Sequence, residues 1–323
     1  MMAAVRIGVL GCADIARRRM LPAMAAESGV EIAAVASRDA ARARDLAGQY
    51  GARPHHGYGS LLERDDVDAV YIPLPAALHA RWTEAALRAG KHVLAEKPLT
   101  TSPADTERLT ALAADSGLAL MENVMFVHHA QHTAVRELVA DGVIGEPRAF
   151  HAAFAIPRLP DGDIRYRPEL GGGALWDVGV YTVRAALHFL GNDLAVVGAT
   201  LDAVGGSPVD TAGTALLRTP DGVGAHLTFG LDHGYRSAYE LWGSLGRITV
   251  ERAFTPPADH RPRIRLEGRD GVEELTLPAD DQVAATVRAF ASAVRDAAPP
   301  DPVLLRQASL LDELRSRAAQ RSP

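Results

Sequence analysis

The alternation of short apolar segments with alanine-rich segments, over about the first 120 residues, limits the fold of this chain more than any other feature. Five segments are short, apolar on both faces and bounded by Gly, Pro or charged residues, as is typical of strands buried within a sheet. These are residues 5–10, 32–36, 69–72, 93–95 and 118–121. The segments between them favour helices, near residues 14–20, 39–49, 78–89 and 103–116. Strands and helices that alternate in this way form βαβ units, so the sequence predicts an α/β fold with a doubly wound parallel sheet.

The pattern changes after about residue 123. Gly171-Gly172-Gly173 opens a long apolar helix that ends at Gly191, and short segments joined by Gly, Asp and Pro turns then indicate strands. We expect these strands at 147–154, 195–201, 211–217, 224–231, 239–242, 246–250, 264–266 and 272–277, and further helices at 131–141, 281–297 and 304–319. The sequence thus predicts a second, α+β domain with an open, mostly antiparallel sheet. We place the domains at 1–122 and 123–323, with the final helices able to pack back on the first domain.

Composition excludes several classes of protein. The 323 residues suffice for about two domains, each with its own core. The single cysteine, Cys12, permits neither an intrachain disulfide nor a cysteine-based zinc site. A net charge of −6 and an aromatic content of 5% are unlike those of a nucleic-acid-binding protein, so we expect no nucleic-acid partner. Because we find neither a signal peptide nor an apolar run of roughly 20 residues, we expect a cytoplasmic protein without membrane contacts.

Residues 7–16, Ile-Gly-Val-Leu-Gly-Cys-Ala-Asp-Ile-Ala, lie where a dinucleotide-binding fold has its phosphate-binding turn. Gly11 can form the tight turn, and Ala13 and Ala16 occupy the positions of the second and third glycines of the G-x-G-x-x-G pattern. The N-terminus of the following helix offers unpaired amides to a pyrophosphate. The alternative is a tight strand-to-helix turn without a ligand. We assign cofactor contacts to Gly11, Cys12, Ala13, Asp14 and Ile15.

The end of the second strand distinguishes between the two nicotinamide cofactors. NAD sites commonly place Asp or Glu there, about 20 residues after the glycine turn, to bind the ribose 2′-hydroxyl. This chain has Ser37 and Arg38, and a hydroxyl beside a guanidinium suits a 2′-phosphate. The sequence therefore favours NADP(H). In the alternative, Arg38 is a solvated residue at the start of a helix and Asp39 contacts the ribose.

Two further motifs carry groups suited to carbonyl reduction. Glu96-Lys97-Pro98 follows a predicted strand, at the edge where ligands bind in open α/β sheets. In the helix opened by the glycines, Asp177 and Tyr181 are four residues apart and share a face. A lysine ammonium or a tyrosine hydroxyl can stabilise the oxyanion that forms when hydride reaches a carbonyl carbon, or can supply a proton. The alternatives are a surface pair of Glu96 with Lys97 and a tyrosine that belongs to the core.

These residues resemble the glucose-fructose oxidoreductase and inositol dehydrogenase family, Gfo/Idh/MocA. The resemblance extends from the turn at Gly11, through Glu96-Lys97-Pro98 and the helix after Gly173, to the second sheet and the closing helices. It implies a Rossmann domain, followed by a domain whose sheet mediates association into a homodimer or homotetramer. It also implies that Lys97 is the shared catalytic lysine and that its bond to Pro98 can be cis.

Within the family, residues 14–22, 121–129 and 163–169 resemble the NDP-hexose 3-ketoreductases of deoxysugar biosynthesis. This resemblance implies NADPH-dependent reduction of the 3-keto group of a dTDP-3,4-diketo-2,6-dideoxyhexose, on the way to antibiotic sugars. Tyr181 is also typical of the branch of dihydrodiol and pentose dehydrogenases. An NADP-dependent dehydrogenase of free sugars such as xylose, or of trans-dihydrodiols, is therefore the main alternative. A third hypothesis is a cofactor-sensing regulator without catalysis, against which Lys97 and Tyr181 both argue.

The resemblance also implies roles for individual residues. Lys97 and Tyr181 would flank the C3 carbonyl of the sugar, and Asp177 would orient the sugar or the lysine. His79 would lie near the nicotinamide. The other candidates are Leu74, Pro75 and Glu96 for the cofactor, Arg165 and Arg167 for the pyrophosphate of the sugar nucleotide, and Asn123, Phe126, His128 and Trp176 for the substrate.

Three histidines have a spacing compatible with metal binding. His128 and His132 are four residues apart, with His129 between them. No carboxylate or further ligand completes a recognisable set nearby, and hydride transfer from NADPH needs no Lewis acid. We therefore expect no metal site here and favour contact between the substrate and His128 or His129.

Overall fold

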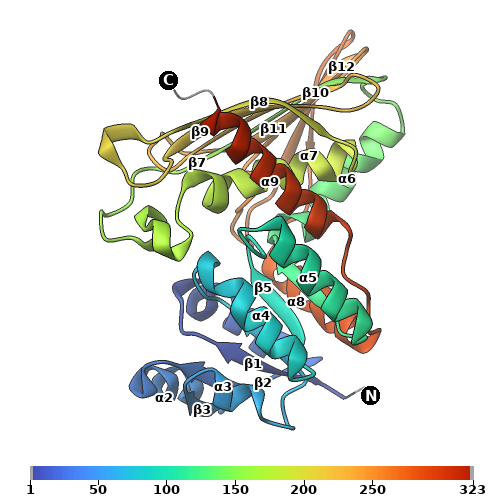
Figure 1. Cartoon of the computed structure of the whole chain (residues 1–323). Helices are drawn as coiled ribbons and strands as arrows, with labels where there is room; N and C mark the ends of the chain where they lie inside the picture. Colours follow the sequence, from blue (N-terminus) through green and yellow to red (C-terminus); the bar gives the residue numbers. More distant parts are fainter. Residues whose placement is uncertain (1–2, 321–323) are drawn as a thin grey trace. The chain divides into compact units, whose positions relative to one another are not determined.

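The structure is a computed structural model that describes residues 3–320 (Figure 1). Contacts divide the chain into two compact units. The first unit comprises the residues up to Asn123 together with Val283–Leu305, and the second comprises Val124–Gln282 together with the residues from Arg306 onward. The chain therefore passes from one unit to the other three times. Across residues 3–320, no helix has the length and apolar character that crossing a membrane requires.

The first unit contains a six-stranded sheet in the order β3-β2-β1-β4-β5-β6, in which all neighbouring strands are parallel. The strands are β1 (Val5–Leu10), β2 (Val30–Ser37), β3 (Arg53–His56), β4 (Ala69–Ile72), β5 (His92–Glu96) and β6 (Leu120–Asn123). This order is that of a Rossmann fold and confirms the predicted fold class. The sequence does not predict β3, because Arg-Pro-His-His is a polar edge strand without an apolar signal.

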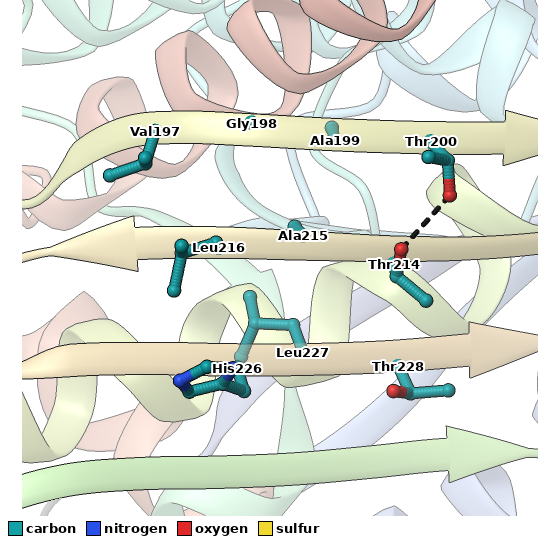
Figure 2. Close-up of a pocket in the computed structure, with 10 residues that line it drawn as sticks. All are labelled: Val197, Gly198, Ala199, Thr200, Thr214, Ala215, Leu216, His226, Leu227 and Thr228. Atoms are coloured by element: carbon teal, nitrogen blue, oxygen red, sulfur yellow. Dashed lines mark hydrogen bonds between the residues drawn. The ribbon is translucent and has the colours of Figure 1, made fainter.

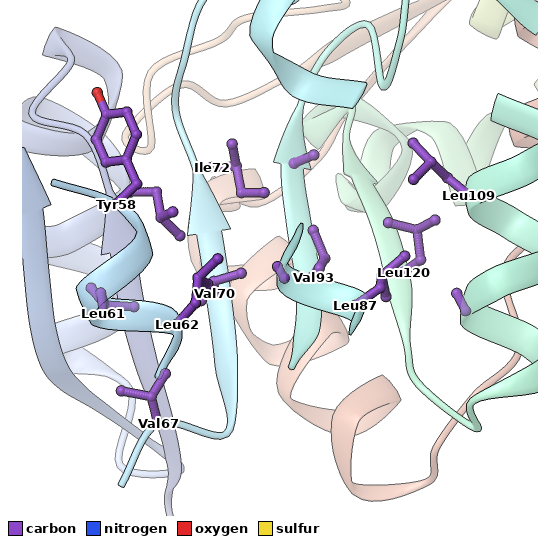
Figure 3. Packing of buried hydrophobic residues seen from close by; sticks show 14 of the residues in the cluster. Tyr58, Leu61, Leu62, Val67, Val70, Ile72, Leu87, Val93, Leu109 and Leu120 are labelled. Atoms are coloured by element: carbon purple, nitrogen blue, oxygen red, sulfur yellow. The ribbon is translucent and has the colours of Figure 1, made fainter. Parts of the chain in front are cut away.

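Helices bury the apolar side chains of this sheet, and five of them, α1 to α5, also connect its strands. They are α1 (Leu21–Ala26), α2 (Ala40–Gly48), α3 (Gly59–Leu62), α4 (His79–Arg88), α5 (Pro103–Asp115) and, from the C-terminal part of the chain, α8 (Gln282–Arg295). Figure 3 shows part of the core, a cluster of buried side chains that includes Val70 and Ile72 of β4, Val93 of β5, Leu87 of α4 and Leu109 of α5. Because β4 and β5 are buried on both faces, they contain continuous apolar runs, which is why the sequence predicts them.

Polar side chains determine where two of these helices begin. The Asp39 carboxylate accepts hydrogen bonds from the backbone amides of Ala41 and Arg42 at the start of α2. The Ser102 hydroxyl accepts one from the amide of Asp105 at the start of α5. Each cap satisfies amides that have no partner within the helix.

The second unit contains an eight-stranded sheet in the order β14-β13-β12-β11-β7-β10-β9-β8. The strands are β7 (Pro147–Ala155), β8 (Ala195–Asp202), β9 (Ala212–Arg218), β10 (Gly224–Gly230), β11 (Arg236–Gly243), β12 (Gly246–Glu251), β13 (Arg263–Gly268) and β14 (Gly271–Thr276). All neighbouring pairs are antiparallel except β7 with β10, which are parallel. The prediction of a mostly antiparallel sheet is therefore confirmed. The parallel pair arises because a long connection, with a helix and two strands, returns the chain to β7.

The two faces of the second sheet differ in what covers them. Phe150, Phe229 and Tyr239 are buried on the face against which α7 (Val180–Leu190) packs. Residues such as Val197 and Trp242 lie on the opposite face and are 47% and 54% exposed; we call this the outer sheet face. Figure 2 shows part of it, a shallow hollow formed by β8, β9 and β10, where the hydroxyls of Thr200 and Thr214 are hydrogen-bonded. The unit also contains α6 (Ala130–Ala140) and most of α9 (Val303–Ala319).

Candidate active site

The carboxyl ends of β1, β4, β5 and β6 bring together the cofactor candidates of the first unit. Gly11 follows β1 with a φ of 129°, which disfavours any residue with a Cβ atom, and a Cβ there would lie 3.1 Å from the Leu74 side chain. The Gly11 amide donates to the Ala36 carbonyl at the end of β2 (2.9 Å). The helix then begins at Asp14 and contains one π-helical turn, Ala16–Met20, before α1. Gly11 and the predicted contacts Cys12, Ala13 and Ile15 thus lie in a tight turn between β1 and a helix start.

The end of β2 carries the residues that the sequence predicts for a 2′-phosphate, Ser37 and Arg38. Arg38 is exposed and lies beside the Tyr58 hydroxyl. The Ser37 hydroxyl accepts a hydrogen bond from the amide of Asp39 (3.1 Å), whose carboxylate caps α2. Because Asp39 has this capping role, its carboxylate is oriented by the helix start rather than by a ribose.

A second arginine, which sequence analysis did not single out, lies at the same end of the site. Arg42 Nη2 donates to the Cys12 carbonyl within the phosphate-binding turn (3.2 Å), and the Cys12 thiol donates to the Arg42 carbonyl (3.6 Å). Burial raises the pKa of Cys12, so this thiol stays protonated and serves as a small packing residue. Arg42 lies in the first turn of α2, four residues after Arg38, and this spacing is the signal that sequence analysis overlooked.

Glu96 is buried at the end of β5 and is not part of a surface pair. Its Oε1 atom accepts hydrogen bonds of 2.6 Å from the Tyr71 hydroxyl of β4 and from Asn123 Nδ2 of β6. Burial raises the pKa of Glu96, and these two donors oppose that effect. Lys97 follows it, half-buried, and the Lys97-Pro98 bond is cis, as the resemblance implies. Asn123, a candidate for the substrate, therefore contacts Glu96 within the first unit.

His79 is completely buried at the start of α4, and its ring lies between two backbone carbonyls. Nδ1 lies 2.7 Å from the Pro98 oxygen, and Nε2 lies 2.6 Å from the Leu74 oxygen. Burial lowers the pKa of the imidazole. His79 thus joins the loop with Leu74 and Pro75 to the turn after Lys97, and it has no free edge with which to contact a nicotinamide.

In the second unit, the predicted apolar helix begins at Ala174 and contains a π-helical turn, Leu175–Gly179, before α7. Gly173 has a φ of 122°, and a Cβ atom there would collide with the Asp210 carboxylate. That carboxylate accepts a hydrogen bond from the amide of Leu175 (2.7 Å). Asp210 is therefore the helix-capping residue that sequence analysis missed, since it lies on a different segment. π-Helical turns have no sequence signal but are frequent at functional sites.

Asp177 lies within this π-helical turn and pairs with Arg165. Arg165 Nε is 2.7 Å from Asp177 Oδ2, and Arg165 Nη1 is 3.1 Å from Asp163 Oδ1. Burial alone would lower the pKa of Arg165, but the carboxylates of Asp177 and Asp163 raise it above its ordinary value. Arg167 is exposed and donates to Glu169 (2.7 Å). Both arginine candidates for the pyrophosphate are thus paired with acidic residues of their own unit.

Tyr181 is half-buried at the start of α7, among aromatic rings. Its ring centroid lies 4.9 Å from that of Phe154, 6.0 Å from that of Phe254 and 6.1 Å from that of Phe126. Phe126 has no exposed surface, so it supports the tyrosine ring from within the core. The ring of Trp176, also buried, lies 5.7 Å from the guanidinium of Arg315.

Two of the three candidate histidines, His129 and His132, have structural partners. His129 Nδ1 accepts a hydrogen bond from the amide of Gln131 and caps α6. His132 is buried, with its ring nitrogens 3.0 Å from the Tyr239 hydroxyl and from the Ala253 carbonyl. Burial and the nearby charge of Arg184 lower the pKa of His128. In the part of the chain that the structure describes, no three His, Cys, Asp or Glu residues are grouped as a metal site would need.

Comparisons with known proteins cover nearly the whole chain. Residues 5–124 match the profile of the Gfo/Idh/MocA oxidoreductase family, NAD-binding Rossmann fold, and residues 132–249 match the profile of the Gfo/Idh/MocA C-terminal domain. The chain is 54% identical over 317 residues to the dTDP-3,4-didehydro-2,6-dideoxy-α-D-glucose 3-reductase of Actinomadura kijaniata, with 97% of this chain and 96% of the relative covered. It is 39% identical over 298 residues to D-xylose 1-dehydrogenase (NADP⁺) 2 of Haloferax volcanii, with 91% and 90% covered.

A solved structure agrees with these matches. The crystal structure of a 3-ketoreductase from Actinomadura kijaniata, in complex with NADP and TDP-benzene, is similar to this chain with a TM-score of 0.94 and 54% identity. The similarity covers 97% of this chain and 98% of the other. The resemblance found in the sequence is thereby confirmed: the chain belongs to the Gfo/Idh/MocA family of oxidoreductases.

Proposed function

We propose that this protein reduces the C3 keto group of a dTDP-linked 3,4-diketo-2,6-dideoxyhexose and that NADPH is the reductant. The observation that carries the proposal is the identity of 54% to a 3-reductase of this substrate class, over 97% of this chain. The similar solved structure contains both NADP and a TDP compound, which supports the cofactor and the nucleotide. The similarity to a D-xylose dehydrogenase supports a second candidate function, the NADP-dependent oxidation of a free sugar.

The first unit has groups suited to NADP(H). Gly11 leaves the backbone open to a pyrophosphate, and the helix that begins at Asp14 directs its amides toward that position. Ser37, Arg38 and Arg42 supply a hydroxyl and two guanidinium groups for the 2′-phosphate. When bound, NADPH supplies the hydride. We propose residues 1–122 as the cofactor domain and residues 123–323 as the domain that holds the sugar nucleotide.

Lys97 and Tyr181 have the chemistry required at the keto group. The lysine ammonium stabilises the negative charge that develops on the C3 oxygen, and either group can deliver the proton. Asp177 orients the sugar or the lysine. The ion pair between Arg165 and Asp177 limits the freedom of the Asp177 side chain. For Arg165 or Arg167 to bind the pyrophosphate, the substrate must compete with the carboxylates of Asp163 or Glu169. A cytoplasmic location suits an enzyme whose one cysteine is a free thiol.

The proposed reaction is tested by its substrate. We expect NADPH oxidation when the dTDP-linked diketo sugar is added, and submillimolar binding of dTDP alone by calorimetry. D-Xylose with NADP⁺ serves as the comparison for the second candidate. Absence of dTDP binding, together with turnover of xylose, would replace the first function by the second. Tight NADPH binding without turnover of either substrate would favour the cofactor-sensing regulator.

The preference for NADPH is expected to depend on Arg38. Arg38→Ala removes charge-assisted hydrogen bonds to the 2′-phosphate, so the Kd for NADPH should rise about 10- to 100-fold while the Kd for NADH stays within about threefold. Fluorescence titration with both cofactors measures the two constants. Arg44→Ala, an exposed arginine farther along α2, is the matched control and should leave both unchanged. An equal loss for NADPH and NADH on Arg38→Ala would contradict the 2′-phosphate role.

Lys97 is expected to act in the chemical step. Lys97→Ala should lower kcat by a factor on the order of 10²–10⁴, because the group that stabilises the C3 oxyanion is removed. NADPH affinity should change little, which separates chemistry from binding. Single-turnover and steady-state rates of NADPH oxidation measure the effect. A loss below about tenfold would assign the role to Tyr181, to solvent or to a sugar hydroxyl.

We also propose that two copies of the chain associate through the outer sheet face. Val197 and Trp242 are apolar side chains that this face exposes, and around the hollow between β8 and β10 lie mainly small and aliphatic residues. A sheet face buried against its symmetric copy would remove this surface from water. Trp242→Arg should therefore convert the oligomer to monomers in light scattering. Val204→Arg, at an exposed residue outside the sheet, is the control and should leave the mass unchanged; a monomeric wild type would refute the association.

A further inference from the structure

In the first unit of the chain, two buried ionisable side chains contact the carbonyl and the amide of a single peptide bond. The carbonyl oxygen of Pro98 lies 2.7 Å from His79 Nδ1, and the amide of Leu99 donates to Glu122 Oε1, also at 2.7 Å. These two backbone groups belong to the same peptide bond, and that bond begins one residue after Lys97. Its plane is therefore oriented from two sides.

The two side chains come from elements on either side of β5 in the chain. His79 begins α4, which packs against β5, and Glu122 belongs to β6, which pairs with β5. His79 has no exposed surface and Glu122 is 4% exposed. Burying ionisable groups opposes folding unless partners compensate, and here their partners are backbone groups of the same turn. Two apolar side chains would fill this space at a lower cost in folding free energy, but they would make no hydrogen bonds to the peptide.

The contact also extends toward the phosphate-binding turn. His79 Nε2 lies 2.6 Å from the Leu74 carbonyl, and the Leu74 side chain approaches Gly11. Carbonyl oxygens only accept hydrogen bonds, so a neutral imidazole donates to one of its two carbonyl neighbours according to its tautomer. The tautomer with its proton on Nδ1 donates to Pro98 and holds this peptide, and its Nε2 edge then faces the Leu74 carbonyl without donating to it.

We propose that His79 and Glu122 are positioning residues for Lys97: together they hold the Pro98–Leu99 peptide and thereby fix the direction in which the lysine side chain leaves the backbone. This inference rests on the proposed role of Lys97 in the chemical step. Neither residue touches the substrate in this scheme. Displacing a catalytic group by about 1 Å can lower a rate about 10²-fold, so a rigid turn at this point has a large effect on the reaction.

The lysine content of the chain permits a direct measurement. Lysine occurs only at positions 91 and 97. Lys91 is buried, and its Nζ atom donates to the carbonyls of Arg64 (2.6 Å) and Val67 (2.8 Å). In protein labelled with ¹³C at lysine Cε, the NMR spectrum therefore contains two side-chain signals. Lys97→Ala assigns them, Lys97 reports on the site, and Lys91 is the internal reference for the fold.

The test compares Glu122→Leu, which removes the acceptor, with Glu122→Gln, which keeps an acceptor oxygen. Glu122→Leu should lower kcat about 10- to 100-fold and leave the KM for the sugar within about threefold of the wild-type value. It should also shift the NMR signal of Lys97 and the midpoint of its titration. The signal and midpoint of Lys91 should stay unchanged. Glu122→Gln should restore kcat to within about fivefold of the wild type. In the Lys97→Ala background, Glu122→Leu should have no further effect on kcat, because positioning acts only through the lysine.

Three results would overturn the proposal: an unchanged Lys97 signal in Glu122→Leu, an equal loss of kcat in the Lys97→Ala background, or a Glu122→Gln variant as slow as Glu122→Leu. If Glu122→Leu does not fold, two other variants take its place: Glu122→Asp, which withdraws the carboxylate by one methylene, and His79→Gln. Each should shift the Lys97 signal and leave the Lys91 signal unchanged.

The NMR measurement on the NADP⁺-bound protein needs no sugar. Absence of turnover in the wild type would therefore refute the proposed function and leave the positioning role to be decided by the Lys97 signal.

Discussion

The parallel pairing of β4, β5 and β6 is the constraint on which the candidate catalytic lysine depends. Parallel strands end at the same edge of a sheet, and here Ile72 pairs with Ala95 while Glu96 pairs with Asn123. Both neighbouring strands can therefore donate to the Glu96 carboxylate, through Tyr71 and Asn123. These two donors stabilise a carboxylate that would be costly to bury alone. Glu96 thereby fixes the end of β5, from which Lys97 extends.

The sequence predicts those parts of the fold whose signal is local. Strands buried on both faces have apolar runs, so β1, β4 and β5 are recognisable without a partner in view. The signal fails for β3, whose exposed edge position permits polar residues, and for the parallel pairing of β7 with β10, which depends on the path of the whole second unit. Hydrophobic periodicity identifies the type of an element, but it contains no information about which distant strand becomes the neighbour.

The same distinction applies to the candidate site. Gly11 and Arg38 could be selected because the roles proposed for them depend on a short motif. Glu122 and Asp210 were missed because each acts on a backbone amide of another segment, and a partner of this kind leaves no pattern in the sequence around either residue. A charged residue directly after the apolar Leu120 and Met121 was the available clue for Glu122, since burial of a carboxylate requires a specific donor.

The threefold passage of the chain between its units has a consequence for biosynthesis. The first 123 residues contain the complete parallel sheet, yet their unit also includes Val283–Leu305, which is made more than 150 residues later. At about 5–20 residues per second, a nascent chain spends many seconds with the Rossmann sheet formed and the place of α8 unfilled. The apolar surface that α8 covers is exposed to water, or to a chaperone, for that interval. The position of α8 in the sequence thus determines how long the first unit remains incomplete on the ribosome.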